Sequence, residues 1–191
     1  MSRDLMHTDE LKAVVRDAYA AIDATTEAVA YKLYSPEELA QVPRSAIEGA
    51  LGVGNHLRFA QIEEGETVLD LGCGAGIDSV LAAQRTGPTG RVIALDFLPE
   101  MLERTSAAAA QAGLVIVETL EAEIEAIPLA DESVDHVISN GVINLSARKR
   151  RVLAECARVL RPGGRLSLSD LTVGDEELPP EVLLHPATWA G

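Results

Sequence analysis

The chain has 191 residues, of which 47% are hydrophobic, and this length and composition suit one well-packed globular domain rather than two. Its 30 acidic and 16 basic residues give a formal net charge of -14 at pH 7, so the molecule as a whole repels nucleic acid phosphates and anionic lipid surfaces. Neither a nucleic acid nor a membrane is therefore an expected partner.

The amino-terminal residues lack the apolar middle of a signal peptide, and no stretch is long and uncharged enough to span a bilayer, which favours a cytoplasmic protein. The chain contains two cysteines, Cys73 and Cys156. Two thiols cannot build a disulfide framework or a cysteine-rich metal cluster within one chain, so no metal site is expected.

Residues 1–64 are expected to form an N-terminal helical cap and substrate-side segment. Apolar residues between positions 8 and 23 recur at helical spacing, which predicts an amphipathic opening helix. The sequence SPEELAQVP, residues 35–43, predicts a short capped helix, and GALGVGNH, residues 49–56, predicts a glycine-rich link.

From residue 67 onward, short apolar strands alternate with helical segments. Strands are predicted at residues 67–71, 91–95, 115–119, 134–139 and 165–170, and helices at residues 76–86, 99–112 and 147–160. The last helix begins after Ser146, its expected cap, and is stopped by the sequence RPGG. This alternation is typical of an α/β fold with a parallel sheet and helices on both faces.

Three alternate glycines, Gly72, Gly74 and Gly76, stand where the first strand hands over to a helix. In a doubly wound sheet, ligands bind outside the carboxyl ends of the strands, and glycines let the backbone turn tightly and approach a ligand. A tight turn without a ligand is the alternative interpretation. The spacing departs from the dinucleotide fingerprint, because Gly76 comes one residue early and Ile77 follows it, which disfavours a dehydrogenase.

Acidic residues flank this turn. Asp70 stands just ahead of the glycines, where a carboxylate can receive a positively charged amino group. Asp96 ends the second strand and is placed like an acidic residue that binds ribose hydroxyls, with capping of the following helix as the alternative role. A nucleoside joined to an amino acid fits both carboxylates.

The sequences DLGCGAG, VIALDFLPEML and AEIEAIPLADESVDHVISN resemble class I S-adenosylmethionine-dependent methyltransferases over residues 65–173. The resemblance implies a Rossmann-like sheet and S-adenosylmethionine as cofactor. It implies cofactor contacts from Asp70, Gly72, Cys73, Gly74 and Gly76 at the methionine end, Asp96 at the ribose, Phe97, Glu123 and Ile124 at the adenine, and Asn140. The alternative interpretation of Glu123 is that it is simply one of several solvated acidic residues in the sequence ETLEAEIE.

Within that class the chain most resembles the arsenite methyltransferases. The resemblance rests on VRDAYAAI, YSPEELAQVP, GVGNH, GIDSVLAA, SNGVINLS, RVLRPGGRLSLSDL and ELPP, which occur in the family's order. It implies that Tyr19 closes over the cofactor and that residues 139–145, including Asn140 and Asn144, line the site of the methyl acceptor.

Two positions depart from this family. Its arsenic-binding thiolates lie in the loop written here GVGN and directly after the SN of SNGVIN, where this chain has Val53 and Gly141. A further family cysteine follows a segment like WAG, and the sequence ends at Gly191. Since a soft metalloid needs soft donors, we expect the arsenic thiolate site to be lacking.

Methyltransferases of this class usually add two more strands after the last one predicted here, and 21 residues follow Asp170. Residues 174–191 are therefore expected to be the tail of a truncated or incomplete domain whose C-terminal strands are missing, leaving an open sheet edge. A truncated or split protein, an oligomer or partner chain that covers the edge, and a recoded stop codon are the competing explanations.

Methyl transfer from a sulfonium depends mainly on positioning of the acceptor, and a base is needed only when the acceptor must lose a proton. His56, in the glycine-rich link, is the candidate substrate-side base, whereas His136 lies within a predicted strand and is interpreted as structural. The basic run 148–151 is interpreted as a solvated helix face, with steering of an anionic substrate as the alternative.

These observations predict a cytoplasmic S-adenosylmethionine-dependent methyltransferase that acts on a small molecule. The alternative is a non-catalytic, methyltransferase-like subunit that needs a partner or an oligomer to complete its fold.

Overall fold

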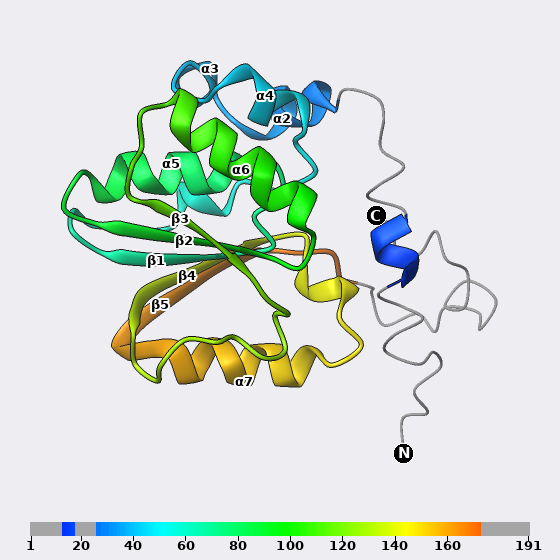
Figure 1. Cartoon of the computed structure of the whole chain (residues 1–191), viewed down its shortest axis with the longest axis vertical. Coiled ribbons are helices and arrows are strands. Elements are labelled where there is room, and N and C mark those ends of the chain that lie inside the picture. The colour runs from blue at the N-terminus through cyan, green and yellow to red at the C-terminus, as the bar shows by residue number, and fades with distance from the viewer. Residues whose placement is uncertain (1–12, 18–25, 173–191) are drawn as a thin grey trace.

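The computed structural model describes residues 13–17 and 26–172 (Figure 1). Residues 13–17 are helical, in agreement with the predicted opening helix. The rest of that helix, including Tyr19, and the predicted tail 174–191 lie outside the described residues. No helix within the described ranges has the length and apolar character needed to cross a membrane.

The centre of the fold is a five-stranded sheet, and every strand pair in it is parallel. Its strands are β1 (Thr67–Leu71), β2 (Arg91–Asp96), β3 (Val117–Glu121), β4 (Val134–Asn140) and β5 (Leu160–Ser169), in the spatial order β3-β2-β1-β4-β5. The chain moves outward from β1 to β3 and then returns to the other side of β1 with β4. The strand order therefore reverses between β1 and β4, where the carboxyl ends of the strands leave a crevice for a ligand.

Helices cover both faces of the sheet (Figure 1). One face carries α5 (Ile77–Thr86) and α6 (Pro99–Gln111), and the other carries α7 (Lys149–Val159). Three short helices, α2 (Glu27–Leu33), α3 (Pro36–Leu39) and α4 (Arg44–Glu48), lie outside α5 and α6. The predicted α/β fold with a parallel sheet is confirmed.

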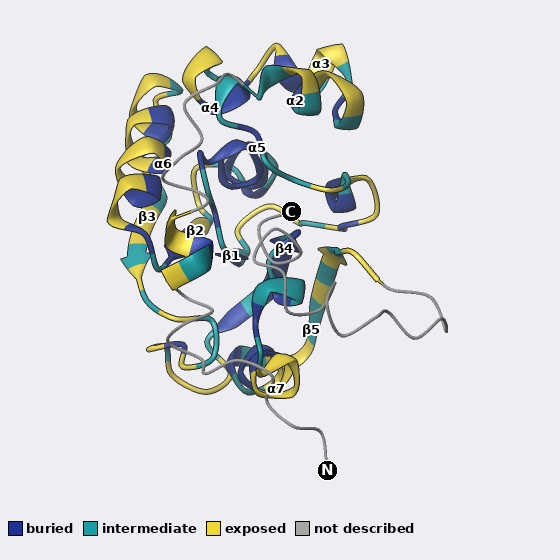
Figure 2. Cartoon of the chain, turned by 90° about the vertical axis from the view of Figure 1, so that its right-hand side faces the viewer, coloured by how far each residue is buried: buried dark blue, intermediate teal, exposed yellow. Residues whose placement is uncertain are grey.

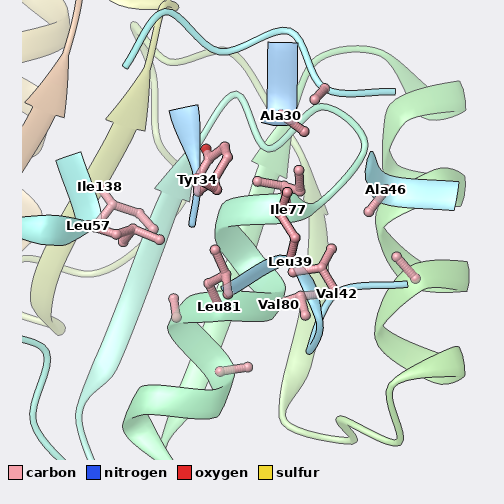
Figure 3. Packing of buried hydrophobic residues seen from close by; sticks show 14 of the residues in the cluster. Ala30, Tyr34, Leu39, Val42, Ala46, Leu57, Ile77, Val80, Leu81 and Ile138 are labelled. Atoms are coloured by element: carbon pink, nitrogen blue, oxygen red, sulfur yellow. The ribbon is translucent and has the colours of Figure 1, made fainter. Parts of the chain in front are cut away.

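The core divides between these two faces because successive side chains of a strand point to opposite sides. Val68 and Ile138 join the cluster that α5 forms with the short helices, part of which Figure 3 shows. Leu69 and Val137 join the cluster on the α7 side, together with Cys156. All four of these strand side chains are fully buried.

The predicted elements differ from the structure mainly at their ends. β5 begins at Leu160, directly after α7, and runs through the RPGG sequence, because Leu160 pairs with Val134 and a register shift follows. α7 begins at Lys149, two residues later than predicted, although Ser146 Oγ does accept a hydrogen bond from the Arg148 amide (2.9 Å). The predicted capped helix after Ser35 forms as α3, with a capping box between Ser35 and Glu38.

Candidate functional site

A pocket lies at the carboxyl ends of β1, β2 and β4, where the strand order reverses. The glycine turn after β1 forms part of its wall. Other lining residues come from the end of β2, from residues 122–125 after β3, from residues 140–142 and 145–147 after β4, and from the loop 49–52. Val15, in the described part of the opening helix, also lines the pocket.

The turn between β1 and α5 depends on glycine conformations. Gly72 and Cys73 donate backbone hydrogen bonds to the Leu95 carbonyl (2.8 and 3.0 Å), which folds the turn back against β2. Gly76, the N-cap of α5, has φ +92°, and a Cβ there would lie 3.0 Å from Thr105 Cα in α6. A Cβ on Gly74 would meet nothing within 4 Å, so the backbone at Gly74 is open to a ligand.

Asp96 connects this turn to the start of α6. Its Oδ2 accepts a hydrogen bond from the Gly74 amide (3.1 Å), and its Oδ1 accepts one from the Leu98 amide (3.0 Å). Burial raises the pKa of Asp96, and the backbone hydrogen bonds oppose that shift. The carboxylate lines the pocket. It accepts from the amide of Leu98, the N-cap residue of α6, but no side chain caps the first turn of that helix, so the capping role considered from the sequence is not seen.

Asp70 and Asp78 occupy different positions relative to the pocket. Asp70 is 2% exposed, is not part of the lining, and accepts a hydrogen bond from Ser79 Oγ (2.6 Å). Burial, with a contribution from the charge of Asp78, raises the pKa of Asp70 to about 8. Asp78 lies in the first turn of α5, lines the pocket, and accepts a hydrogen bond from the Tyr34 hydroxyl (2.8 Å).

Tyr34, which also lines the pocket, follows α2, and burial raises the pKa of its hydroxyl so that it stays protonated and donates. Neither Tyr34 nor Asp78 is among the site residues predicted from the sequence. Two features of the sequence could have pointed to them: Asp78 is an acidic residue in the helix that begins after the glycine turn, and Tyr34 is the first residue of YSPEELAQVP.

Asn140, at the end of β4, holds the neighbouring loop in place. Its Nδ2 lies within hydrogen-bond distance of the Tyr34 hydroxyl (3.1 Å), Asp78 Oδ2 (3.0 Å) and the Gly54 carbonyl (2.9 Å). Its Oδ1 accepts hydrogen bonds from the amides of Val53 (2.9 Å) and Gly54 (3.2 Å). One side chain thus connects β4, α5, the residue after α2 and the glycine-rich link.

This arrangement brings Val53 against Gly141. A Cβ built on Gly141, where φ is +72°, would lie 3.0 Å from Val53 Cγ1 and 3.7 Å from Val53 Cβ. The two positions at which the resemblance to the arsenite methyltransferases predicts thiolates are therefore neighbours, and neither Val53 nor Gly141 offers a donor atom in its side chain.

The remaining predicted site residues fall into two groups. Phe97, Glu123 and Ile124 line the pocket. His56 and Asn144 do not. His56 lies in the 3-10 turn η1 (His56–Arg58) at 2% exposure, and neither ring nitrogen has a hydrogen-bond partner within the described chain.

The backbone amide of Asn144, in the turn η2 (Ile143–Leu145), donates to Asp170 Oδ2 (3.1 Å). His136 is fully buried within β4, and its Nε2 lies 2.9 Å from Ser167 Oγ in β5. Its position supports the structural interpretation.

Both cysteines of the chain are buried. Cys73 is buried in the glycine turn, and burial raises its pKa well above the ordinary value. Cys156 lies in the core beneath α7, and burial raises its pKa to about 11. Across residues 13–17 and 26–172, no group of His, Cys, Asp and Glu side chains is arranged to hold a metal ion.

Residues 62–189 match the family model of a methyltransferase domain. The arsenite methyltransferase of Halobacterium salinarum is 46% identical over 158 residues, which cover 83% of this chain and 40% of that protein. The solved arsenic(III) S-adenosylmethionine methyltransferase of Chlamydomonas reinhardtii has a TM-score of 0.68 and 36% identity, over 91% of this chain and 54% of that chain.

A methyltransferase of Haloferax volcanii, solved in complex with the Trm112 methyltransferase activator, is also similar, with a TM-score of 0.52 and 35% identity. The match covers 60% of this chain and 49% of that one. The present chain thus spans between 40% and 54% of the length of these three proteins.

Proposed function

The chain belongs to the family of S-adenosylmethionine-dependent methyltransferase domains, and from this premise we propose that it binds S-adenosylmethionine and directs its methyl group to a small molecule. The observation that carries the proposal is the pocket at the reversal of strand order, whose wall contains both the glycine turn and Asp96. The similarity to the arsenite methyltransferase of Halobacterium salinarum and to the solved Chlamydomonas reinhardtii enzyme supports the same proposal.

The residues of the pocket fit this cofactor. The backbone at Gly74 is open, so the methionine part can approach it closely, and Asp96 is in place to accept hydrogen bonds from the ribose hydroxyls. Phe97 and Ile124 supply apolar surface for the adenine ring, and Glu123 lies beside them to accept from its amino group. Carboxylates in the lining also complement the positive charge of a sulfonium.

The cofactor supplies an electrophilic methyl group, so the chain's own residues have mainly to orient the two reactants and exclude water. Asn140 fixes the loop that carries Val53, and Val53 packs against Gly141, which lines the pocket. We propose that this apolar contact takes the place of the thiolate pair of the arsenite enzymes, so that the acceptor is a small molecule other than arsenite.

Calorimetric titration of the chain with S-adenosylmethionine, and in parallel with arsenite, tests the proposal. We expect the cofactor to bind and arsenite not to bind. The double variant Val53→Cys/Gly141→Cys is the matched comparison, because the Cβ atoms at these positions are close enough for two thiolates to share one arsenic atom. Absence of cofactor binding would refute the cofactor assignment, and arsenite binding by the unmodified chain would refute the assignment of the acceptor.

The second candidate function is a non-catalytic subunit that pairs with another chain. The observation that favours it is β5, which forms one edge of the sheet built by the described residues (Figure 2). Leu166 and Leu168 of this strand are 37% and 42% exposed. An open apolar edge strand is a template for pairing with another chain. Two results together would favour this candidate over the enzyme. The chain would bind the cofactor but form no S-adenosylhomocysteine with any tested acceptor, and it would sediment as a stable dimer.

A further inference from the structure

We propose that Asp78, and not Asp70, is the carboxylate that receives the ammonium group of the cofactor's amino-acid part, and that Tyr34 and Asn140 position it. This inference rests on the proposed function and refines it. Sequence patterns direct attention to Asp70, because that residue directly precedes the glycine turn. The structure separates the two acids by burial, by hydrogen bonding and by access to the pocket.

Access is the first difference. Asp70 lies within β1 at 2% exposure, outside the pocket lining, and its Oδ2 is engaged by Ser79 Oγ of α5. Asp78, the residue before Ser79 in α5, lines the pocket, and the partners of its two carboxylate oxygens, Tyr34 and Asn140, are lining residues as well. A ligand in the pocket can therefore reach Asp78 without displacing the backbone of the glycine turn.

Charge is the second difference. The described lining contains acidic side chains but no lysine, arginine or histidine, so a cationic ligand group meets no repulsion from it. Asp70 is held largely in its neutral form at neutral pH by burial and by the neighbouring charge of Asp78. A neutral carboxyl group is a poor partner for an ammonium, and the first turn of α5 favours a negative charge at Asp78.

Orientation is the third difference. The Tyr34 hydroxyl donates to Asp78 Oδ1 (2.8 Å), and Asn140 Nδ2 lies 3.0 Å from Asp78 Oδ2. A carboxylate offers about four lone-pair positions, so each oxygen keeps capacity for one further donor. The two neutral donors thus fix the plane of the carboxylate and leave it able to accept from an ammonium group.

The test compares two ligands with the same adenosine part. S-adenosylhomocysteine carries the amino-acid part with its ammonium group, and 5'-methylthioadenosine lacks it. Calorimetry should show that Asp78→Asn weakens S-adenosylhomocysteine binding by about ten- to a hundredfold, the range expected for loss of a charge-assisted hydrogen bond, and leaves 5'-methylthioadenosine binding unchanged. The matched variant Asp70→Asn should change neither affinity, because that side chain lies outside the pocket lining.

Tyr34→Phe gives the second, milder variant. It removes one hydrogen-bond donor to Asp78 without changing the charge of the site. We expect a smaller loss of affinity than in Asp78→Asn, for S-adenosylhomocysteine and not for 5'-methylthioadenosine. This variant carries the test if Asp78→Asn does not fold. The inference is overturned if Asp78→Asn binds S-adenosylhomocysteine as tightly as the unmodified chain, if it weakens both ligands equally, or if Asp70→Asn reproduces its effect. Failure of the unmodified chain to bind either ligand would instead overturn the proposed function.

Discussion

Replacing Gly76 with alanine should destabilise the fold through both backbone strain and steric overlap. The residue has φ +92°, a conformation that costs a residue with a side chain about 1–2 kcal/mol. The added methyl group would also lie 2.9 Å from Thr105 Oγ1 and 3.0 Å from Thr105 Cα, and overpacking of this kind costs about 1–3 kcal/mol. Since a backbone atom cannot rotate away, we expect the free energy of unfolding to fall by about 2–5 kcal/mol.

Two other glycines separate strain from overlap. Gly113 and Gly74 have φ +68° and +52°, and a Cβ on either would meet nothing within 4 Å. In urea unfolding followed by circular dichroism, the free energy of unfolding of each alanine variant should therefore fall only by the cost of backbone strain, about 1–2 kcal/mol. Gly74→Ala should in addition weaken cofactor binding, because its methyl group enters the pocket, whereas Gly113→Ala should not. A Gly76→Ala loss no larger than that of Gly113→Ala would refute the close packing of α5 against α6.

Three further changes probe the core, the surface and the buried acids. Arg158→Ala should lower the free energy of unfolding by about 1–3 kcal/mol, because its guanidinium satisfies two backbone carbonyls and two carboxylates. Arg44→Ala removes only an exposed ion pair and should leave the urea unfolding curve nearly unchanged. Leu69→Ala, at a fully buried position, should cost about 2–5 kcal/mol, and a loss as small as that of Leu153→Ala on the exposed side of α7 would contradict the assigned core. Because burial raises the pKa of Asp70 to about 8 from 3.8, this residue contributes a loss of stability as the pH rises from about 4 to about 8. Asp70→Asn should remove that contribution, so stability should fall less with pH in the variant than in the unmodified chain; equal slopes in unfolding measured at several pH values would speak against it.

The place of the pocket could be predicted from the sequence because its signal is local. In DLGCGAGIDSV the end of β1, the glycine turn and the start of α5 are contiguous, and Asp96 ends the next strand. The start of β5 and the short helices α2 and α4 were harder to predict. β5 starts inside a sequence rich in glycine and proline, since pairing with Val134 outweighs local preference there.

The contacts of Asp78 could not be predicted, because its partners are distant in the chain. Tyr34 is 44 positions from Asp78, and Asn140 is 62 positions from it. The sequence shows that each residue is polar but does not show that all three meet. The burial of His56 could not be predicted either. The residue stands in a glycine-rich link typical of functional loops, yet it is buried and does not line the pocket.

The hydrogen bonds of Asn140 have a consequence for the kinetics of folding. The contact between Asn140 and Tyr34 spans 106 positions, and Asn140 is the last residue of β4, which pairs with β1 in the centre of the sheet. Contacts of such long range form late, since the loop they close must first lose its conformational freedom. Recovery of cofactor binding in a refolding experiment should therefore follow the slowest phase, after most helical signal has returned, so that ligand binding reports on completion of the central sheet.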